Sequence, residues 1–256
     1  MGTETNPITG NESNEHWRRA ASMAREVALE FLWPTRCAVC DLQGEKVLCA
    51  ECEASLLYID DLDACPACGA PYGRLQCTEC NAAVLEPTGL EEVPFDLMRH
   101  SVVLDDAAKQ IVAVYKDGDE RRLSDDIARI LSYKVSPEEI GSGFAITFIP
   151  DTLQALRRRG FDHSEEIASK LSAITGLPLA MTLERPTGSD QRALGRAGRF
   201  SNMIAAMTAR PKDLPRRLLL IDDVCTTGAT IYSACVALRE AGAESIHVLT
   251  FGLVTD

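Results

Sequence analysis

Two kinds of hydrophobic pattern alternate along the second half of the chain. Short, largely apolar runs occur at 97–104, 143–150, 177–184, 216–222 and 245–254. Between them, apolar residues recur every three or four positions at 105–116, 121–135, 164–176 and 228–243. Apolar runs of this length are typical of strands buried on both faces, and the longer period is typical of amphipathic helices. The pattern predicts an α/β fold with a parallel sheet flanked by helices.

The start of the chain is polar apart from one helical pattern. The apolar residues of segment 15–32 fall near one face of a helix, and they are Trp17, Ala21, Ala24, Ala28 and Phe31. Pro34 would end this helix. No run of 18 or more apolar residues occurs, so no membrane span is expected. The first residues also lack the basic and apolar segments of a secretory signal, so we expect a cytoplasmic protein.

Ten cysteines are present, and eight of them form two blocks with the same spacing. Each block has two C-x2-C loops separated by eight residues, and the second block repeats the first at an offset of 28. The eight are Cys37, Cys40, Cys49, Cys52, Cys65, Cys68, Cys77 and Cys80. A C-x2-C loop lets two thiolates point at one tetrahedral ion. The spacing therefore predicts a small module that binds one or two Zn²⁺ ions.

A disulfide framework is the alternative for these cysteines, and the absence of a secretory signal argues against it. Pairing of loops within each block is the simplest arrangement, while crossed pairing of the first loop with the third is also open by spacing. Four thiolates leave no position for water on a tetrahedral ion, so we expect a structural role. Such a short segment has little core of its own, and the metal would supply its folding free energy.

Composition divides the chain into segments. Prolines and acidic residues gather at 84–95, where we place a boundary between a cysteine module at 35–84 and a domain at 95–256, with 1–34 as tail and helix. The net charge is -12, yet residues 157–217 carry 12 basic and 6 acidic side chains. This excludes a uniformly basic nucleic-acid coat and leaves room for a local anion site in the second half.

The run RLLLIDDVCTTGAT at 217–230 brings two carboxylates to the end of a predicted strand. Open parallel sheets bind ligands at the carboxyl ends of their strands, which would place Asp222 and Asp223 at the ligand edge. The next loop offers hydroxyls, a glycine and free amides before a helix whose N-terminus attracts phosphate. Groups that donate hydrogen bonds to phosphate, placed beside two carboxylates, suit a sugar phosphate as the ligand. The alternative is a capped surface turn, but one polar residue suffices for a cap.

The segment IDDVCTTGAT resembles the signature with which type I phosphoribosyltransferases bind phosphoribosyl diphosphate (PRPP). With the cysteine blocks in front, the chain is similar to the ComF family of competence-associated, phosphoribosyltransferase-like proteins. Further matching segments are YKDG at 115–118, IPDTLQALRRRGFDHSEEIA at 149–168 and RPTGSDQRALGRAGRFSN at 185–202. The resemblance implies a type I phosphoribosyltransferase-like domain preceded by a double zinc ribbon.

The resemblance also implies a role for each matching residue. Asp222 and Asp223 would bind the ribose hydroxyls with Mg²⁺ nearby, and they would be the catalytic residues of a pyrophosphate-releasing transfer. The 5-phosphate would be held by Thr226, Thr227, Gly228, Ala229 and Thr230. The candidates for pyrophosphate or flap contacts are Lys116, Arg157, Arg158, Arg159, Arg185, Arg192 and Arg196, with Gln191 and Arg199 in the same flap segment.

Two positions depart from the family pattern. Asp162 and His163 stand where the family commonly has asparagine and glutamine after the RGF tripeptide. His163 has acidic neighbours and no partner pattern, so we expect it on the solvated surface. Of the two remaining cysteines, Cys225 would pack in the signature loop and Cys235 in the core.

Two further hypotheses concern function. The ComF resemblance implies work in DNA uptake, with single-stranded DNA and a DNA-uptake translocase as expected partners. The chain could then be a non-catalytic DNA- or protein-binding scaffold, because a fold does not fix a function. The basic stretch 157–217 could meet DNA phosphates, although Phe161 and Phe200 are its only aromatic residues. Alternatively the cysteine module is the functional part and docks a partner, since its acidity disfavours nucleic acid.

Overall fold

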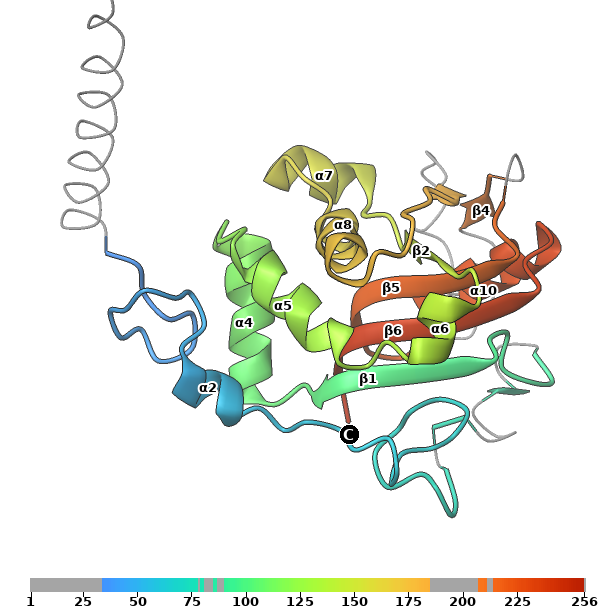
Figure 1. The fold of residues 1–256 in the computed structure, drawn as a ribbon, viewed down its shortest axis with the longest axis horizontal. Coiled ribbons are helices and arrows are strands. Elements are labelled where there is room, and N and C mark those ends of the chain that lie inside the picture. The colour runs from blue at the N-terminus through green and yellow to red at the C-terminus, as the bar shows by residue number, and fades with distance from the viewer. Residues whose placement is uncertain are drawn as a thin grey trace, which may run out of the picture. The chain divides into compact units, whose positions relative to one another are not determined.

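A four-stranded parallel sheet forms the centre of the computed structural model (Figure 1), which describes residues 34–77, 79–80, 85–86, 90–184, 207–210 and 214–255. The strand order is β1-β6-β5-β2. The bounds are Leu97–Val103 for β1, Ala145–Phe148 for β2, Arg217–Cys225 for β5 and Ser245–Leu253 for β6. Every pairing in this sheet is parallel. The parallel sheet that the apolar runs predicted is therefore confirmed.

Helices cover both faces of the sheet. On one face, α5 (Leu123–Ser132) packs on β6, and α8 (His163–Thr175) packs on α5, β5 and β2. On the other, α10 (Ala229–Glu240) shares an apolar core with Leu218 and Leu220 of β5. Side chains alternate along a strand, so Leu219 and Ile221 face the opposite way, and all four are fully buried. No helix in the described ranges is long and apolar enough to cross a membrane.

The helix ends follow local sequence rules. Asp105 caps α4 (Asp106–Asp117) by accepting a hydrogen bond from the N–H of Ala108. Asp162 caps α8 in the same way, accepting from Glu165. Each such cap is worth about 1 kcal/mol. At its other end α8 stops at Gly176, whose φ of 75° is left-handed, a conformation that glycine adopts readily at helix ends.

Some segments differ from the prediction. The run 177–184 forms only an isolated bridge from Leu179 to Ile146 and then the two-residue strand β3 (Leu183–Glu184), which pairs antiparallel with β4 (Thr208–Ala209). Pro178 has no N–H to donate, which limits a longer ladder at this point. The short helices α6 (Pro137–Gly141) and α7 (Leu153–Arg159) were not predicted, because so few residues show no clear hydrophobic period.

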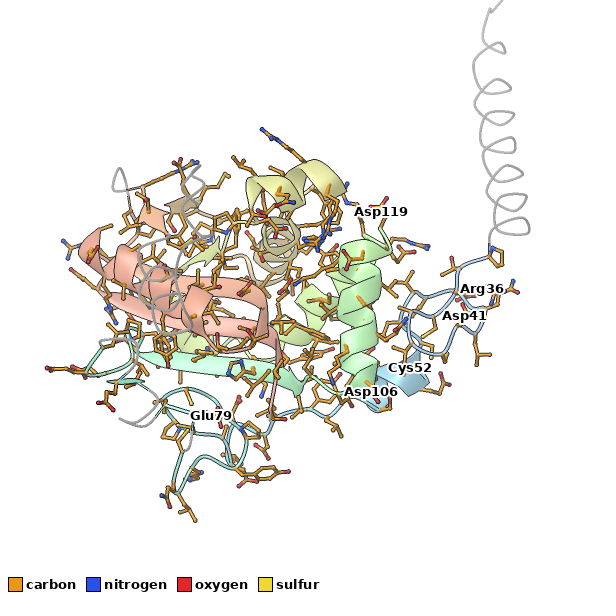
Figure 2. All side chains as sticks on the ribbon, turned by 180° about the vertical axis from the view of Figure 1, so that it is seen from behind. Arg36, Asp41, Cys52, Glu79, Asp106 and Asp119 are labelled. Atoms are coloured by element: carbon orange, nitrogen blue, oxygen red, sulfur yellow. The ribbon has the colours of Figure 1, made fainter. Side chains whose placement is uncertain are left out.

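Internal contacts divide the chain into two compact units, Met1–Cys49 and Ala50–Asp256. In the first, the guanidinium of Arg36 bonds the backbone carbonyl and the carboxylate of Asp41 (Figure 2). The second contains α2 (Ala50–Ala54), the second cysteine block and the sheet. The division of the sequence into a tail and helix at 1–34, a cysteine module at 35–84 and a domain at 95–256 stays a prediction. The helix expected at 15–32 lies outside the described residues.

Residues 57–59 lie along the outer edge of β1. The N–H of Ile59 donates to the carbonyl of Ser101 at 3.0 Å, and the N–H of Val103 donates to the carbonyl of Leu57 at 2.9 Å. These bonds form an antiparallel bridge on the strand that ends the sheet. An open strand edge is a template for aggregation, so this pairing protects the sheet.

Two basic residues of the α5 region hold the same segment from a second side. Arg129 bonds both carboxylate oxygens of Glu53, at 2.6 and 2.8 Å. Lys134 bonds the carbonyl of Ile59 at 2.6 Å and the carboxylate of Asp61 at 2.7 Å. Residues 53–61, which connect the two cysteine blocks, are therefore fixed on the sheet-containing half of the chain by backbone pairing and by charge.

Candidate functional site

Asp222 and Asp223 lie within β5 rather than just after it. The strand continues to Cys225, past the end predicted at residue 222. β2 pairs with β5 only as far as Phe148 opposite Ile221, whereas β6 accompanies β5 to its last residue. The two acids thus occupy the carboxyl edge at the point where β5 loses one of its neighbours. Open parallel sheets bind their ligands in this position.

Each acid is held by a different helix. Asp223 is buried, and its Oδ2 lies 2.5 Å from the Nζ of Lys116 in the last turn of α4. Asp222 is partly exposed, and its Oδ1 accepts from the hydroxyl of Ser164 in α8 at 3.3 Å. A buried carboxylate needs such a counter-charge to offset its lost hydration. The arrangement orients two carboxylates at one edge and leaves Asp222 the more accessible.

The loop after β5 leads directly into an uncapped helix. Thr226 and Thr227 are exposed, and Gly228 is buried with a left-handed φ of 72°. Gly228 is the N-cap of α10 and offers no side chain, and the N–H of Ala229 makes only a long 3.5 Å contact with the hydroxyl of Thr227. The first amides of this 12-residue helix therefore face the loop, an arrangement that suits a phosphate group.

The arginines predicted to contact pyrophosphate form the last turn of α7. Arg158 and Arg159 each lie 3.2 Å from the same carboxylate oxygen of Asp117, the residue that follows Lys116. Arg157 is exposed in the same turn. The structure thus brings the arginine turn to the end of α4, where Lys116 reaches Asp223. The other basic candidates, Arg185, Arg192 and Arg196, lie outside the described residues, as do Gln191 and Arg199.

His163 is only 1% exposed, so the expected position on the solvated surface is wrong. Its Nδ1 lies 2.6 Å from a carboxylate oxygen of Asp151, and its ring packs edge-on against Tyr115. Burial would raise the pKa of Asp151, but the hydrogen bond from His163 and the charge of Arg159 outweigh it and lower that pKa. Asp151 is twelve residues away across α7, and no local pattern indicates this pairing.

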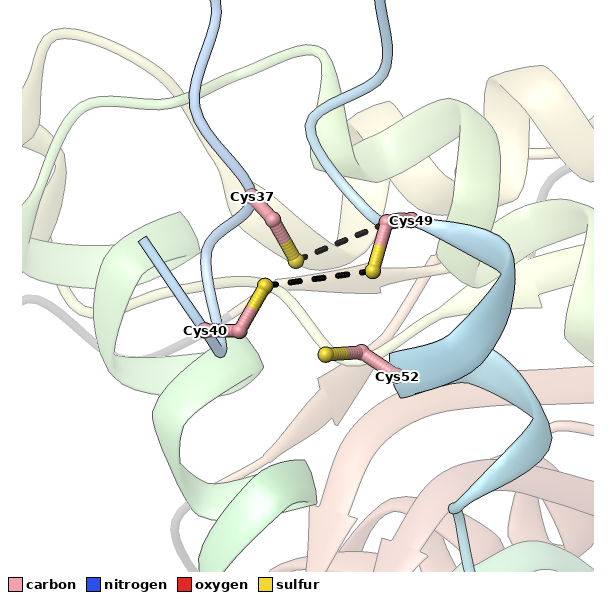
Figure 3. Close-up of side chains that lie close together, drawn as sticks. All are labelled: Cys37, Cys40, Cys49 and Cys52. Atoms are coloured by element: carbon pink, nitrogen blue, oxygen red, sulfur yellow. Dashed lines mark hydrogen bonds between the residues drawn. The ribbon is translucent and has the colours of Figure 1, made fainter. Parts of the chain in front are cut away.

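The first cysteine block forms one cluster. The sulfurs of Cys37, Cys40, Cys49 and Cys52 all lie within 4.8 Å of one another (Figure 3). Zn–S bonds of about 2.3 Å in a tetrahedron separate the sulfurs by about 3.8 Å, and Cys40 and Cys49 are 3.9 Å apart. Burial would raise the pKa of Cys37, but hydrogen bonds from Cys40 and Cys49 lower it to about 6. The block therefore offers a fitting thiolate site for Zn²⁺.

The second block forms a second cluster with the same fit. The sulfurs of Cys65 and Cys80 are 3.7 Å apart, and those of Cys68 and Cys77 are 3.4 Å apart. All ten cysteines are free thiols, so a disulfide framework is not what the structure shows. Each cluster draws its ligands from one block, which confirms the sequential grouping over the crossed one. Four sulfurs per cluster suit a closed, structural Zn²⁺ site.

A known protein is similar to most of the chain. The competence protein ComFC of Streptococcus pneumoniae (strain ATCC BAA-255 / R6) is 25% identical over 210 residues, which cover 82% of this chain and 88% of the relative. This confirms the resemblance to the ComF family. No model of a known protein family matches the sequence.

Several solved structures also match the chain, with low overall similarity. They include the allosteric regulatory enzyme of purine biosynthesis, with 21% identity and a TM-score of 0.36. The glutamine PRPP amidotransferase of B. subtilis has 22% identity and a TM-score of 0.37. Both matches cover 50% of this chain and only 25% of the solved chain. Orotate phosphoribosyltransferase from Aeropyrum pernix has 20% identity and a TM-score of 0.30, covering 66% of this chain and 78% of its own.

The two positions that depart from the ComF pattern stabilise the start of α8. Asp162 caps the helix and also accepts from the backbone N–H of Asp151 at 2.6 Å. Burial raises the pKa of Asp162. His163 accepts a hydrogen bond at its backbone carbonyl from the hydroxyl of Tyr115 at 2.9 Å. Both residues therefore fix the turn that presents Ser164 to Asp222. Cys225 is buried at the end of β5, and Cys235 is fully buried in the core as expected.

Proposed function

We propose that the chain binds PRPP or a related phosphoribosyl compound, together with Mg²⁺, at the carboxyl edge of β5. One observation carries the proposal: the paired acids Asp222 and Asp223 stand six and five residues before Gly228, the N-cap of a helix without a side-chain cap. Carboxylates accept hydrogen bonds from vicinal hydroxyls, and helix amides donate to phosphate. A ribose phosphate presents both kinds of group.

The residues divide this task among them. Residues 226–230 hold the 5-phosphate through backbone amides and hydroxyls. Asp222 and Asp223 accept from the ribose hydroxyls, and their oxygens are ligands of the kind Mg²⁺ prefers. Mg²⁺ bound there with the ligand's phosphates supplies positive charge against a leaving pyrophosphate. Lys116 and the arginine turn of α7 offer further positive charge beside the same edge.

We further propose that this site can transfer the phosphoribosyl group. An acceptor would form a bond to the anomeric carbon while the bond from that carbon to pyrophosphate breaks, so no covalent intermediate with the protein is needed. The chain would hold the ribose by Asp222 and Asp223 and orient the anomeric carbon toward the acceptor. Positive groups beside the edge would stabilise the charge that develops on pyrophosphate.

The relative from Streptococcus pneumoniae is named a competence protein, and this supports a place for the chain in cytoplasmic DNA uptake. Single-stranded DNA and a DNA-uptake translocase are the proposed partners. A scaffold without catalysis is the second candidate function. Strand binding that weakens steeply with salt and survives loss of Asp222 and Asp223 would favour the scaffold, because phosphate contacts release counterions.

Calorimetric titration of Mg²⁺ and PRPP into the zinc-loaded protein tests the proposed site. We expect binding by the unaltered chain and none by an Asp222→Asn/Asp223→Asn variant, which keeps the shape of both side chains and removes their charge. Asp125→Asn is the matched control, since Asp125 is an exposed carboxylate on α5 that pairs with Lys170. Absence of binding in the unaltered chain, or equal binding in all three proteins, would contradict the proposal.

A further inference from the structure

The second cysteine cluster is built into the core that supports the ligand edge. Cys65 and Cys68 belong to the same apolar core as Leu220 and Tyr232. The carbonyl of Ala67, between these cysteines, accepts from the N–H of Met98 in β1 at 3.0 Å. Metal ligands of this cluster are thus joined to the sheet by backbone as well as by packing.

His100 connects the cluster to the strand beside the acids. Its Nε2 lies 2.9 Å from the carbonyl of Cys68, and its Nδ1 lies 2.7 Å from the hydroxyl of Thr250. A carbonyl only accepts, so Nε2 carries the proton and Nδ1 accepts from Thr250. Thr250 is the direct partner of Asp222 in the β5–β6 pairing. A buried chain of bonds therefore runs from a metal ligand to the cross-strand neighbour of an acid.

Tyr232 makes a second connection, to the phosphate loop. Its ring lies so close to Gly228 that a Cβ at that position would be 2.7 Å from the ring. The same ring packs edge-on against Phe95. Tyr232 also belongs to the same apolar core as Cys65 and Cys68, and Cys80 packs against that core. One aromatic side chain therefore contacts the glycine of the loop and shares a core with ligands of the second cluster.

We propose that Tyr232 is a positioning residue for the phosphate loop, and that metal binding at the second cluster is coupled to ligand binding at that loop. The ligand's identity rests on the proposed function, whereas the link between cluster and loop rests on the core that Tyr232 shares with the cluster and on its contact with Gly228. Two sites are coupled when each ligand favours the same arrangement of a shared element. Here the shared element is the ring of Tyr232 against Gly228.

The physical basis is the ordering of the loop. Bound metal would fix Cys68 and Cys80 in the core that they share with Tyr232, and a ring held in that core limits the backbone at Gly228. The helix amides are useful to a phosphate only when they share one orientation. A loop that is already ordered costs the ligand less conformational entropy, so each partner strengthens the binding of the other.

Hydrogen exchange tests the link without any ligand. The full chain carrying Cys37→Ser/Cys40→Ser keeps only the second cluster, so its metal state can be set by chelation. On metal removal, we expect exchange at the amides of 228–232 to rise at least fivefold more than exchange in α8, which serves as the internal control. Tyr232→Phe should retain this response. Tyr232→Leu should exchange fast in this segment even with metal bound, because the ring is absent.

Competition for zinc tests the coupling itself. Zinc affinity of the second cluster is measured against a chromophoric chelator with and without ribose 5-phosphate, which lacks the chelating diphosphate of PRPP. We expect the sugar phosphate to raise that affinity about 5- to 150-fold, the usual range for coupled sites. Tyr232→Phe should keep the increase and Tyr232→Leu should lose it, although both still bind zinc.

The outcomes separate this inference from the proposed function. If calorimetry detects sugar-phosphate binding but zinc affinity and loop exchange are unaffected, the coupling is overturned and the proposed function stands. If no sugar phosphate binds but metal removal still releases 228–232 through Tyr232, the proposed function fails and the positioning role is supported. A rise in exchange that is equal in α8 would show global unfolding and would overturn the positioning role.

Discussion

The two cysteine blocks have the same ligand spacing but meet different surroundings. In both, the second cysteine of the first loop is followed by a left-handed residue, Asp41 with φ 58° and Gly69 with φ 70°. The N–H of each donates to the carbonyl of the first cysteine, Cys37 or Cys65, at 2.9 Å. The local backbone is therefore repeated, although one position carries a charged side chain and the other carries none.

The environment of that repeated turn explains the difference. The side chain of Asp41 is largely exposed and pairs with Arg36. At Gly69, a Cβ would lie 2.5 Å from the backbone carbonyl of Met98 in β1. Glycine is needed there for its left-handed φ and also because a strand lies against it. The comparison teaches that spacing specifies the metal site, while the residues between the ligands specify what the site packs against.

Removal of metal ligands should show the largest difference between the two blocks. We expect Cys65→Ser/Cys68→Ser to lower the unfolding temperature of the Ala50–Asp256 unit while the unit stays folded at room temperature, because its sheet and helices keep an apolar core of their own. The loss follows from the binding free energy that structural zinc contributes to folding. Cys37→Ser/Cys40→Ser should leave the unfolding transition of that unit unchanged. Near-ultraviolet circular dichroism during heating, with zinc content by mass spectrometry, measures both. Equal damage by the two variants would remove the distinction.

Alanine at the repeated left-handed position should have a smaller effect of the same sign. Gly69→Ala introduces a left-handed alanine, at about 1–2 kcal/mol, and a contact with β1, at about 1–3 kcal/mol. Asp41→Ala changes no packing contact and leaves only an unfavourable backbone conformation. Beyond the loss of its pair with Arg36, the variant should lose no more than about 1 kcal/mol of unfolding free energy. Urea unfolding of each variant gives the two free energies. A Gly69→Ala protein as stable as Asp41→Ala would show that β1 can shift away from the added Cβ without loss of stability.

Thiol reactivity should reveal the smallest difference. In metal-free protein at pH 7, the pKa of Cys37 is lowered to about 6. In the second block the pKa of Cys65 is also lowered, but burial raises that of Cys80 to about 12. Access favours the first block, because Cys40 is exposed although Cys37 is buried, whereas Cys65 and Cys68 are both buried. We expect iodoacetamide to modify the first block at least tenfold faster, and the ratio to fall toward one in denaturant. Peptide mass spectrometry follows each block, and equal native rates would contradict the difference in environment.

Much of the fold follows from local pattern. The apolar runs that became β1, β2, β5 and β6 are buried on both faces, so nearly every residue carries the signal. The signature run at 217–230 gave the place of Asp222 and Asp223 for the same reason, since a strand and a helix N-terminus are both visible in sequence. The run 177–184 was misassigned as a full strand because its composition is apolar but Pro178 cannot complete a ladder.

The contacts that tie the site together could not be predicted from local pattern. Lys116 was chosen as a pyrophosphate candidate, yet its partner in the structure is Asp223, more than a hundred residues later. His100 meets Cys68 on one side and Thr250 on the other, at separations of 32 and 150 residues. A single sequence carries no signal for such pairs, because each member taken alone resembles any polar residue in a helix or strand.

The segment 57–59 has a consequence for the order in which the chain is made. β1 leaves the ribosome long before its sheet partner, since Leu97 pairs with His247 near the C-terminus. Its antiparallel neighbour, by contrast, has already been synthesised. Ile59 is 42 residues from Ser101 along the chain, whereas Leu97 is 150 residues from His247. Closing a short loop costs less entropy than closing a long one. During synthesis, residues 57–59 can thus pair with one edge of β1 before β6 has been made.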